Sequence, residues 1–284
     1  MKNKIYYVIN IIFLVTSILF VNYTGILEMK FTIWQLSILA LIFLIIHTFK
    51  FFKIYFILLE EKIPLKTMIK LYIKTAFVST VLPYKIGELF KMYTYGNEIK
   101  NYTKGIIAVT IDKFFDSLIL CLILVPYSLI MTGKVSEMGL IMFVFFIVTL
   151  MIYMCFENTY YYLNKFFVLK NQTQKSVLAL KALEKVHGVY IKTKEMLRGR
   201  YLILLISTAV AWGFESIFIY VIAGFMNIKV EFMTVTNYIS DAFFGINNIL
   251  FNNYIYICTA IFLIMTLVIY FNKYVWKKRI QKQL

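Results

Sequence analysis

The chain alternates long apolar runs with short polar stretches that are rich in lysine. Six apolar runs are predicted to cross a membrane as helices; they cover residues 5–21, 34–47, 106–131, 138–156, 201–226 and 253–271. A spanning helix needs about 20 mainly apolar residues. The run 34–47 is shorter, and it reaches Phe56 if Lys50 and Lys53 snorkel to the surface. The pattern predicts an all-α, polytopic integral membrane protein with about six spanning helices.

Two further stretches have the pattern of broken helices. Residues 65–95 begin as an amphipathic helical segment, become small and apolar, break at Pro83 and resume near Gly87. Irregular backbone at membrane depth must be buried in protein or line a wet cavity. We therefore predict a re-entrant hairpin that enters from the cytoplasmic side. Residues 230–251, which contain Asp241, are predicted to re-enter from the outer side, as in transporters with opposed broken helices.

Residues 158–200 combine basic side chains with an apolar helical stripe in their second half. The stripe consists of Val177, Leu180, Leu183, Val186 and Tyr190. This pattern is typical of a connector that lies on the lipid interface, so we expect a cytoplasmic amphipathic segment here. Because no Pro/Gly/Ser-rich linker divides the chain, residues 1–284 are predicted to form one integral membrane domain.

Composition and charge set the orientation. The chain is 61% hydrophobic and only 15% charged, which excludes a soluble globular domain. Its 30 basic residues all fall on the side of the N-terminus except Lys30, Lys113, Lys134 and Lys229. The positive-inside rule then places both termini in the cytoplasm. Topology and anionic lipid head groups explain the net charge of +16. We therefore expect membrane lipids, and no nucleic acid, as partners in a prokaryotic cytoplasmic membrane.

Motifs for metals and nucleotides give no support to a bound cofactor. Three cysteines stand far apart in apolar surroundings, and the two histidines form no HExxH or paired pattern. The chain also has no Gly-x-x-x-x-Gly-Lys-Ser/Thr segment, so a transport cycle would be passive or coupled to an ion. No metal and no cofactor are predicted.

Charged residues gather where the membrane tolerates them least. The set at the hairpin break and the start of the third span is Lys85, Glu88, Lys91, Asp112, Lys113 and Asp116. An ionisable group at membrane depth costs several kcal/mol unless it is paired or faces water, so it marks a functional site by default. Asp112 and Asp116 share a helix face. We expect Lys85 and Lys91 to pair with them, and Glu88 to pair with Lys113.

This cluster has two compatible interpretations: a lock that holds the hairpin on the third span, and a site for an anionic head group. A further carboxylate, Glu215, lies inside the fifth span near Trp212. We expect Glu215 to form an ion pair with a lysine of the cluster, or to act as a protonatable group in coupling. Trp212 has an alternative role as a packing or interface aromatic.

Three motifs together resemble a known family. Leu-Pro-x-basic-x-Gly-Glu-x-x-basic covers residues 82–91, basic-x-x-Asp covers Lys113 and Asp116, and Trp-x-x-Glu covers Trp212 and Glu215. This combination resembles the lysylphosphatidylglycerol synthase transmembrane family, whose members also appear as flippase-like domain proteins. Lysines stand at positions 85, 91 and 113, where the family has arginines, so bidentate phosphate contacts are lost.

The resemblance implies a translocase (flippase) of an anionic phospholipid or a polyprenyl-phosphate-linked glycan. In this hypothesis the substrate-binding residues are Lys85, Lys91 and Lys113. The structural ion-pair network comprises Pro83, Gly87, Glu88, Asp112, Asp116, Trp212 and Glu215. We do not expect lysyl transfer, because the family's soluble aminoacyl-transferring domain is missing from this sequence.

Two other hypotheses remain open. The pair Asp112 and Asp116 could supply acid and base to a membrane-embedded transferase. Alternatively, the protein is a non-transporting partner that binds a glycosyltransferase or another envelope enzyme through residues 158–200.

Overall fold

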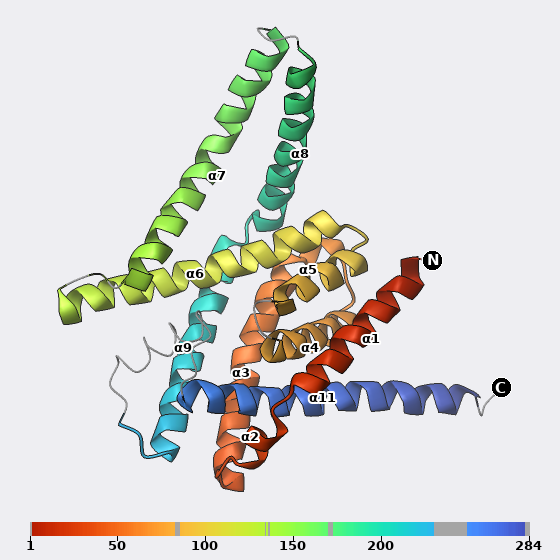
Figure 1. The fold of residues 1–284 in the computed structure, drawn as a ribbon, viewed down its shortest axis with the longest axis vertical. Coiled ribbons are helices and arrows are strands. Elements are labelled where there is room, and N and C mark those ends of the chain that lie inside the picture. The colour runs from red at the N-terminus through yellow and green to blue at the C-terminus, as the bar shows by residue number, and fades with distance from the viewer. Residues whose placement is uncertain are drawn as a thin grey trace.

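The computed structural model describes residues 2–82, 86–133, 135, 137–169, 173–229 and 249–281. These ranges contain helices and no strand, which confirms the predicted all-α class. The α-helices are α1 (Lys2–Phe20), α2 (Tyr23–Leu27), α3 (Ile33–Ile57), α4 (Leu65–Val81), α5 (Ile86–Glu98), α6 (Tyr102–Thr132), α7 (Glu137–Leu169), α8 (Gln174–Leu197), α9 (Tyr201–Phe225) and α11 (Ile249–Gln281) (Figure 1). A short 3-10 turn, η1 (Leu59–Glu61), joins α3 to α4.

Several helices are long and apolar enough to cross a membrane. Among the described residues these are α3, Gly139–Leu169 of α7, α9 and Ile249–Ile269 of α11, and a shorter apolar segment occupies Ile5–Phe20 of α1. The run predicted at 106–131 lies in α6, which carries four charged residues in its first half, Lys104, Asp112, Lys113 and Asp116. A multi-pass membrane protein is therefore confirmed. The helices overrun the predicted bounds, since α7 continues 13 residues past Phe156.

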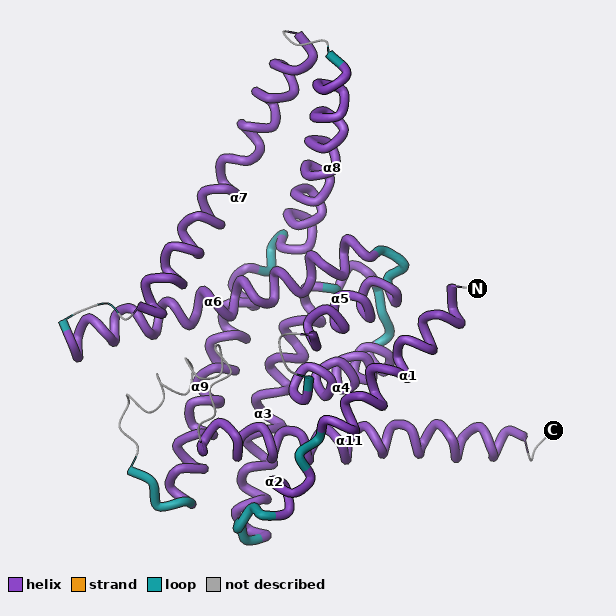
Figure 2. The backbone as a smooth tube through the Cα atoms, viewed as in Figure 1, coloured by secondary structure: helices purple, strands orange, loops and turns teal. Residues whose placement is uncertain are grey.

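The body of the protein is built around α3 and α9, which lie along each other (Figures 1 and 2). Two groups of buried side chains fill it. One group packs Phe43, Phe77 and Phe218 between α3, α4 and α9. The other packs Met68 of α4 and Phe115 of α6 together with side chains of α3, α5, α8 and α9. The α4–α5 pair contributes to both cores.

The predicted helix–break–helix over residues 65–95 is present as α4 and α5. At 1.5 Å per residue, the 17 residues of α4 span about 25 Å. This length is below the roughly 30 Å of a bilayer's hydrocarbon core. A Cβ atom on Gly87 would collide with the backbone of Ser79, so the glycine lets α5 approach α4 closely. Pro83 and Lys85 lie outside the described residues, as does most of the predicted second re-entrant element at 230–251.

Helices α7 and α8 form a hairpin that projects from the body (Figure 1). The ring of Tyr160 in α7 stacks on His187 in α8, with centroids 3.7 Å apart. The predicted connector at 158–200 is thus the end of α7 together with α8, which packs back along α7. Many of its apolar side chains remain exposed, including Tyr162 and Leu178.

The turn between α3 and α4 is held by basic side chains from two other helices. Arg200 donates to Glu60 at 2.7 Å and to the carbonyl oxygen of Phe56 at 3.3 Å. Lys104 pairs with Glu61. These contacts tie the starts of α6 and α9 to the same turn.

Candidate functional site

A buried lysine of α3 joins the two aspartates of α6. The Nζ atom of Lys53 lies 2.6 Å from Oδ1 of Asp112 and 2.7 Å from Oδ1 of Asp116. It also lies 3.3 Å from the carbonyl oxygen of Asp112. Because an ammonium has three donors, these contacts use its whole capacity. The Lys53 side chain is 2% exposed, so the prediction that it snorkels to the surface is wrong.

A second lysine of α3 neutralises the carboxylate of α9. Lys50 donates to Glu215 at 2.5 Å, and the Glu215 side chain is 7% exposed. The same ammonium lies 5.6 Å from the ring centroid of Trp212, within cation–π range. Trp212 Nε1 also donates to Asp116 Oδ1 at 3.3 Å. The tryptophan therefore connects α9 to α6 and is more than a packing aromatic.

Two lysines share the carboxylate of α5. Oε1 of Glu88 lies 3.0 Å from Nζ of Lys113 and 3.3 Å from Nζ of Lys91. The predicted Glu88–Lys113 pair is thus present. The described partner of Lys91 is Glu88, whereas the sequence led us to expect the two aspartates. Oε2 of Glu88 is buried and has no hydrogen-bond partner among the described residues.

The charges balance in number but are unevenly placed. In the described part of the cluster, Lys50, Lys53, Lys91 and Lys113 face Glu88, Asp112, Asp116 and Glu215. Two carboxylates surround Lys53, whereas two lysines surround Glu88. The part of the cluster around Glu88 therefore has more positive than negative groups, and we call this the positive excess. Lys113 is the most exposed of the four lysines of the cluster, because half of its side chain is exposed.

Neutral hydrogen bonds fasten α4 to the helices beside the cluster. The hydroxyl of Tyr72 lies 2.8 Å from Nδ1 of His47 in α3. Thr75 and the hydroxyl of Tyr95 in α5 lie 3.2 Å apart, and both residues are buried. These pairs orient the α4–α5 hairpin on α3, which positions Glu88 next to α6.

Lys50 and Lys53 are members of the site that were not predicted from the sequence. Both lysines were expected at the cytoplasmic surface because they follow the apolar run 34–47. A usable signal was present in their spacing, since residues three apart share a helix face. Two lysines on one face of an apolar helix can meet carboxylates on two different partner helices.

The architecture defines a polytopic α-helical membrane domain with an ion-pair cluster at the crossing of α3, α5, α6 and α9. Residues 8–247 match the family described as the lysylphosphatidylglycerol synthase TM region. The chain belongs to this family, as its motifs at 82–91, 113–116 and 212–215 predicted. Comparison with curated proteins and with solved structures gave no match.

Proposed function

We propose that this protein is a translocase (flippase) of an anionic phospholipid or a polyprenyl-phosphate-linked glycan. Its place is the cytoplasmic membrane of a prokaryote, with both termini in the cytoplasm. The observation that supports this proposal best is the positive excess around Glu88. Lys91 and Lys113 share that single carboxylate, and Lys113 is half exposed beside the break between α4 and α5.

In the proposed mechanism a head-group phosphate binds to Lys113 and Lys91. A lysine ammonium attracts phosphate as a point charge and does not require the fixed fork geometry of arginine. Such a contact suits a substrate that has to be released again. Lys85 would add a third positive charge from the break itself.

The remaining charges have a structural role in this mechanism. Lys53 holds α3 against α6 through Asp112 and Asp116, and Lys50 holds α3 against α9 through Glu215. In this mechanism, rigid packing on one side would allow the hairpin at 65–95 to move as a gate. Movement would be passive or coupled to an ion, because the chain has no nucleotide-binding motif.

The geometry argues against the transferase hypothesis. Both candidate acid–base groups, Asp112 and Asp116, accept from the same buried lysine. A general base must be free to reach a proton on its substrate. Lys53 occupies Oδ1 of each aspartate, so a transferase mechanism would have to use Oδ2 of one of them.

The projecting α7–α8 hairpin favours a second candidate, a non-transporting partner of a glycosyltransferase or another envelope enzyme. Its outer surface exposes Tyr161, Tyr162 and Leu178, each by more than 60%. Exposed aromatic and aliphatic side chains of this kind are suited to protein contacts. In this alternative the ion-pair cluster only holds the helices together and binds no head group.

Leaflet exchange in proteoliposomes tests the proposal. Labelled phosphatidylglycerol and a polyprenyl-phosphate glycan are compared in wild type, Lys113→Gln, Lys91→Gln and the matched control Lys181→Gln on exposed α8. A charge-assisted hydrogen bond contributes about 1.5–3 kcal/mol, so exchange should fall roughly tenfold or more in the two cluster variants. The control should match wild type.

A double variant of the hairpin, Tyr162→Ser with Leu178→Ser, separates the two candidates. A translocase keeps its exchange rate in this variant, whereas a partner protein loses its enzyme in pull-down from membranes. Wild-type exchange no faster than in empty liposomes, for every lipid offered, would refute transport.

A further inference from the structure

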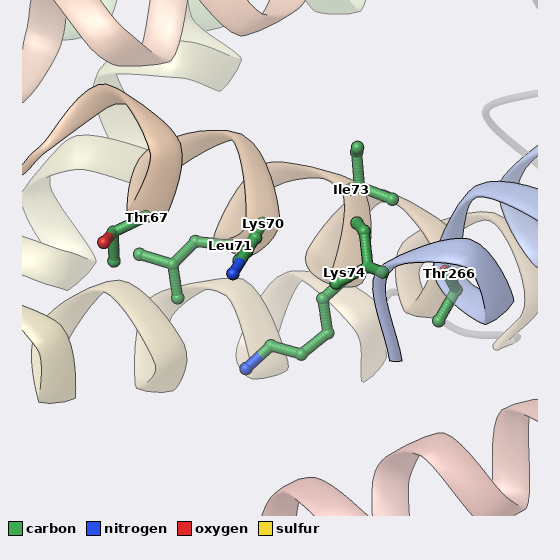
Figure 3. Close-up of a pocket in the computed structure, with 7 residues that line it drawn as sticks. Thr67, Lys70, Leu71, Ile73, Lys74 and Thr266 are labelled. Carbon is green, nitrogen blue, oxygen red and sulfur yellow. The ribbon is translucent and has the colours of Figure 1, made fainter. Parts of the chain in front are cut away.

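A groove lies between α4 and α11, away from the ion-pair cluster. Its volume is about 190 Å³, and its lining includes Thr67, Lys70, Leu71, Ile73 and Lys74 of α4 and Thr266 of α11 (Figure 3). Its aliphatic lining consists of Leu71, Ile73 and Ile269. The polar groups are two ammonium groups and two hydroxyls, and no carboxylate of the described residues lines the groove.

The two lysines are placed to act on one ligand. Lys70 and Lys74 are four residues apart, so they share a face of α4 about 6 Å apart along its axis. Figure 3 shows their side chains extending from the same side of α4. Neither forms an ion pair with a described carboxylate. Their charge is therefore available to an anion.

Lys74 is held in position by α1 without being neutralised. Its Nζ atom donates to Oδ1 of Asn10 at 2.6 Å and to the hydroxyl of Tyr6 at 3.3 Å. Both acceptors are uncharged. Since an ammonium has three donors, one remains beyond these two contacts. The same ammonium lies 5.5 Å from the ring centroid of Tyr6 and 5.6 Å from that of Phe90 in α5. These contacts orient the side chain without an ion pair to a described carboxylate.

Thr266 supplies an independent sign of a ligand. The residue is 8% exposed, and its Oγ1 atom has no hydrogen-bond partner among the described residues. Burying a hydroxyl without a partner costs free energy. A threonine in a helix usually satisfies its hydroxyl on a preceding carbonyl oxygen. Thr266 instead lines the groove from α11, where a ligand oxygen would satisfy it (Figure 3).

We propose that this groove binds the phosphate diester of an anionic phospholipid. Lys70 and Lys74 contact the phosphate oxygens, the Thr266 hydroxyl donates to one of them, and Leu71 and Ile73 contact an acyl chain. The aliphatic lining favours a lipid over free phosphate. The bound lipid would bridge α1, α4 and α11.

This site is separate from the proposed translocation site. The cluster side of α4 is the one that bonds to α3 and α5 through Tyr72 and Thr75. The groove lies on the side that meets α1 and α11. The lipid is accordingly a resident ligand of the fold, and the proposal holds whether or not the protein transports.

The test is lipid binding by the full chain in detergent, followed by native mass spectrometry during titration with short-chain phosphatidylglycerol. The variants are Lys70→Gln and Thr266→Val, and Lys66→Gln is the matched control, because it lies one turn before Lys70 and does not line the groove. We expect affinity to fall roughly tenfold in Lys70→Gln and several-fold in Thr266→Val, as expected for a lost phosphate hydrogen bond. Lys66→Gln should match wild type.

Two further readouts make the result specific. Thr266→Val should keep the thermal stability of the apo protein, because valine has the shape of threonine without the unpaired hydroxyl. In a Lys113→Gln background, Lys70→Gln should cause the same roughly tenfold loss of affinity as it does in the wild-type background, which separates this site from the translocation site.

Several outcomes would overturn the proposal. Equal losses in Lys66→Gln and Lys70→Gln would mean diffuse surface attraction. Unchanged binding in both Lys70→Gln and Thr266→Val would mean that no built site exists. Displacement of the lipid by inorganic phosphate at equal concentration would assign the groove to a soluble anion.

Discussion

The charge cluster in the body and the α7–α8 hairpin contain the same types of side chain, but these differ in burial and therefore in their expected effect on stability. Both contain lysine–carboxylate pairs next to aromatic rings. In the body, Lys53 is 2% exposed and its two aspartates are 15% and 19% exposed. In the hairpin, Lys194 and Glu157 lie 3.2 Å apart, with 57% and 43% of their side chains exposed. Burial, and not residue type, separates a structural ion pair from a surface one.

The same contrast holds for the apolar side chains. The most apolar window of α9 is 39% buried within the protein, whereas that of α7 is 11% buried. A spanning helix with so little protein around it meets lipid on most of its surface. We therefore expect substitutions in the body to change stability strongly and those in the hairpin to change it little.

Removal of the lysine at the centre of the cluster should have the largest effect. Lys53→Met leaves Asp112 and Asp116 buried without their cation, which should destabilise the protein by about 3–5 kcal/mol. Thermal unfolding in detergent measures this loss. In the matched hairpin variant, Lys194→Met, the unfolding temperature should not change measurably.

A compensating variant separates charge from packing. Lys53→Met combined with Asp112→Asn and Asp116→Asn removes the uncompensated charge, so most of the lost stability should return. A triple variant as unstable as Lys53→Met alone would show that the lysine acts through packing of its stem.

A methyl group at the α4–α5 contact should have the next largest effect. In Gly87→Ala the new Cβ meets the backbone of Ser79, which cannot rotate away as a side chain could. Overpacking of this kind typically costs about 1–3 kcal/mol. Chemical denaturation should show the loss. An unchanged denaturation midpoint would mean that α4 and α5 move apart in the variant with no loss of stability.

The matched substitution in the hairpin should have the opposite sign. Gly188 lies within α8, and no atom lies within 4 Å of a Cβ built there. Gly188→Ala should stabilise the protein by about 0.4–1 kcal/mol, because alanine reduces the freedom of the unfolded chain. Hydrogen exchange of α8 amides measures this gain. Faster exchange in the variant would contradict the open space around Gly188.

Much of the fold could be predicted from the sequence because helix formation in a membrane depends on local hydropathy. Every predicted apolar run has a helix over it, and the break after Val81 lies where the apolar stripe meets Pro83. The Glu88–Lys113 pair was also predicted from the sequence, because ionisable groups at membrane depth need a partner of opposite charge.

The partners of the aspartates were decided by tertiary structure. The spacing of Asp112 and Asp116 showed that they share a face, but not which helix would cover that face. That choice depends on how α3 packs against α6 and α9, through contacts between residues 59 to 165 positions apart. Lys53 thus turns inward although its stretch of the sequence was predicted to lie at the cytoplasmic surface. The sequence by itself determined where the helices form, because hydropathy and breaks act locally. Only the tertiary structure decided which charges meet, because the cost of burying an ion is relieved through space.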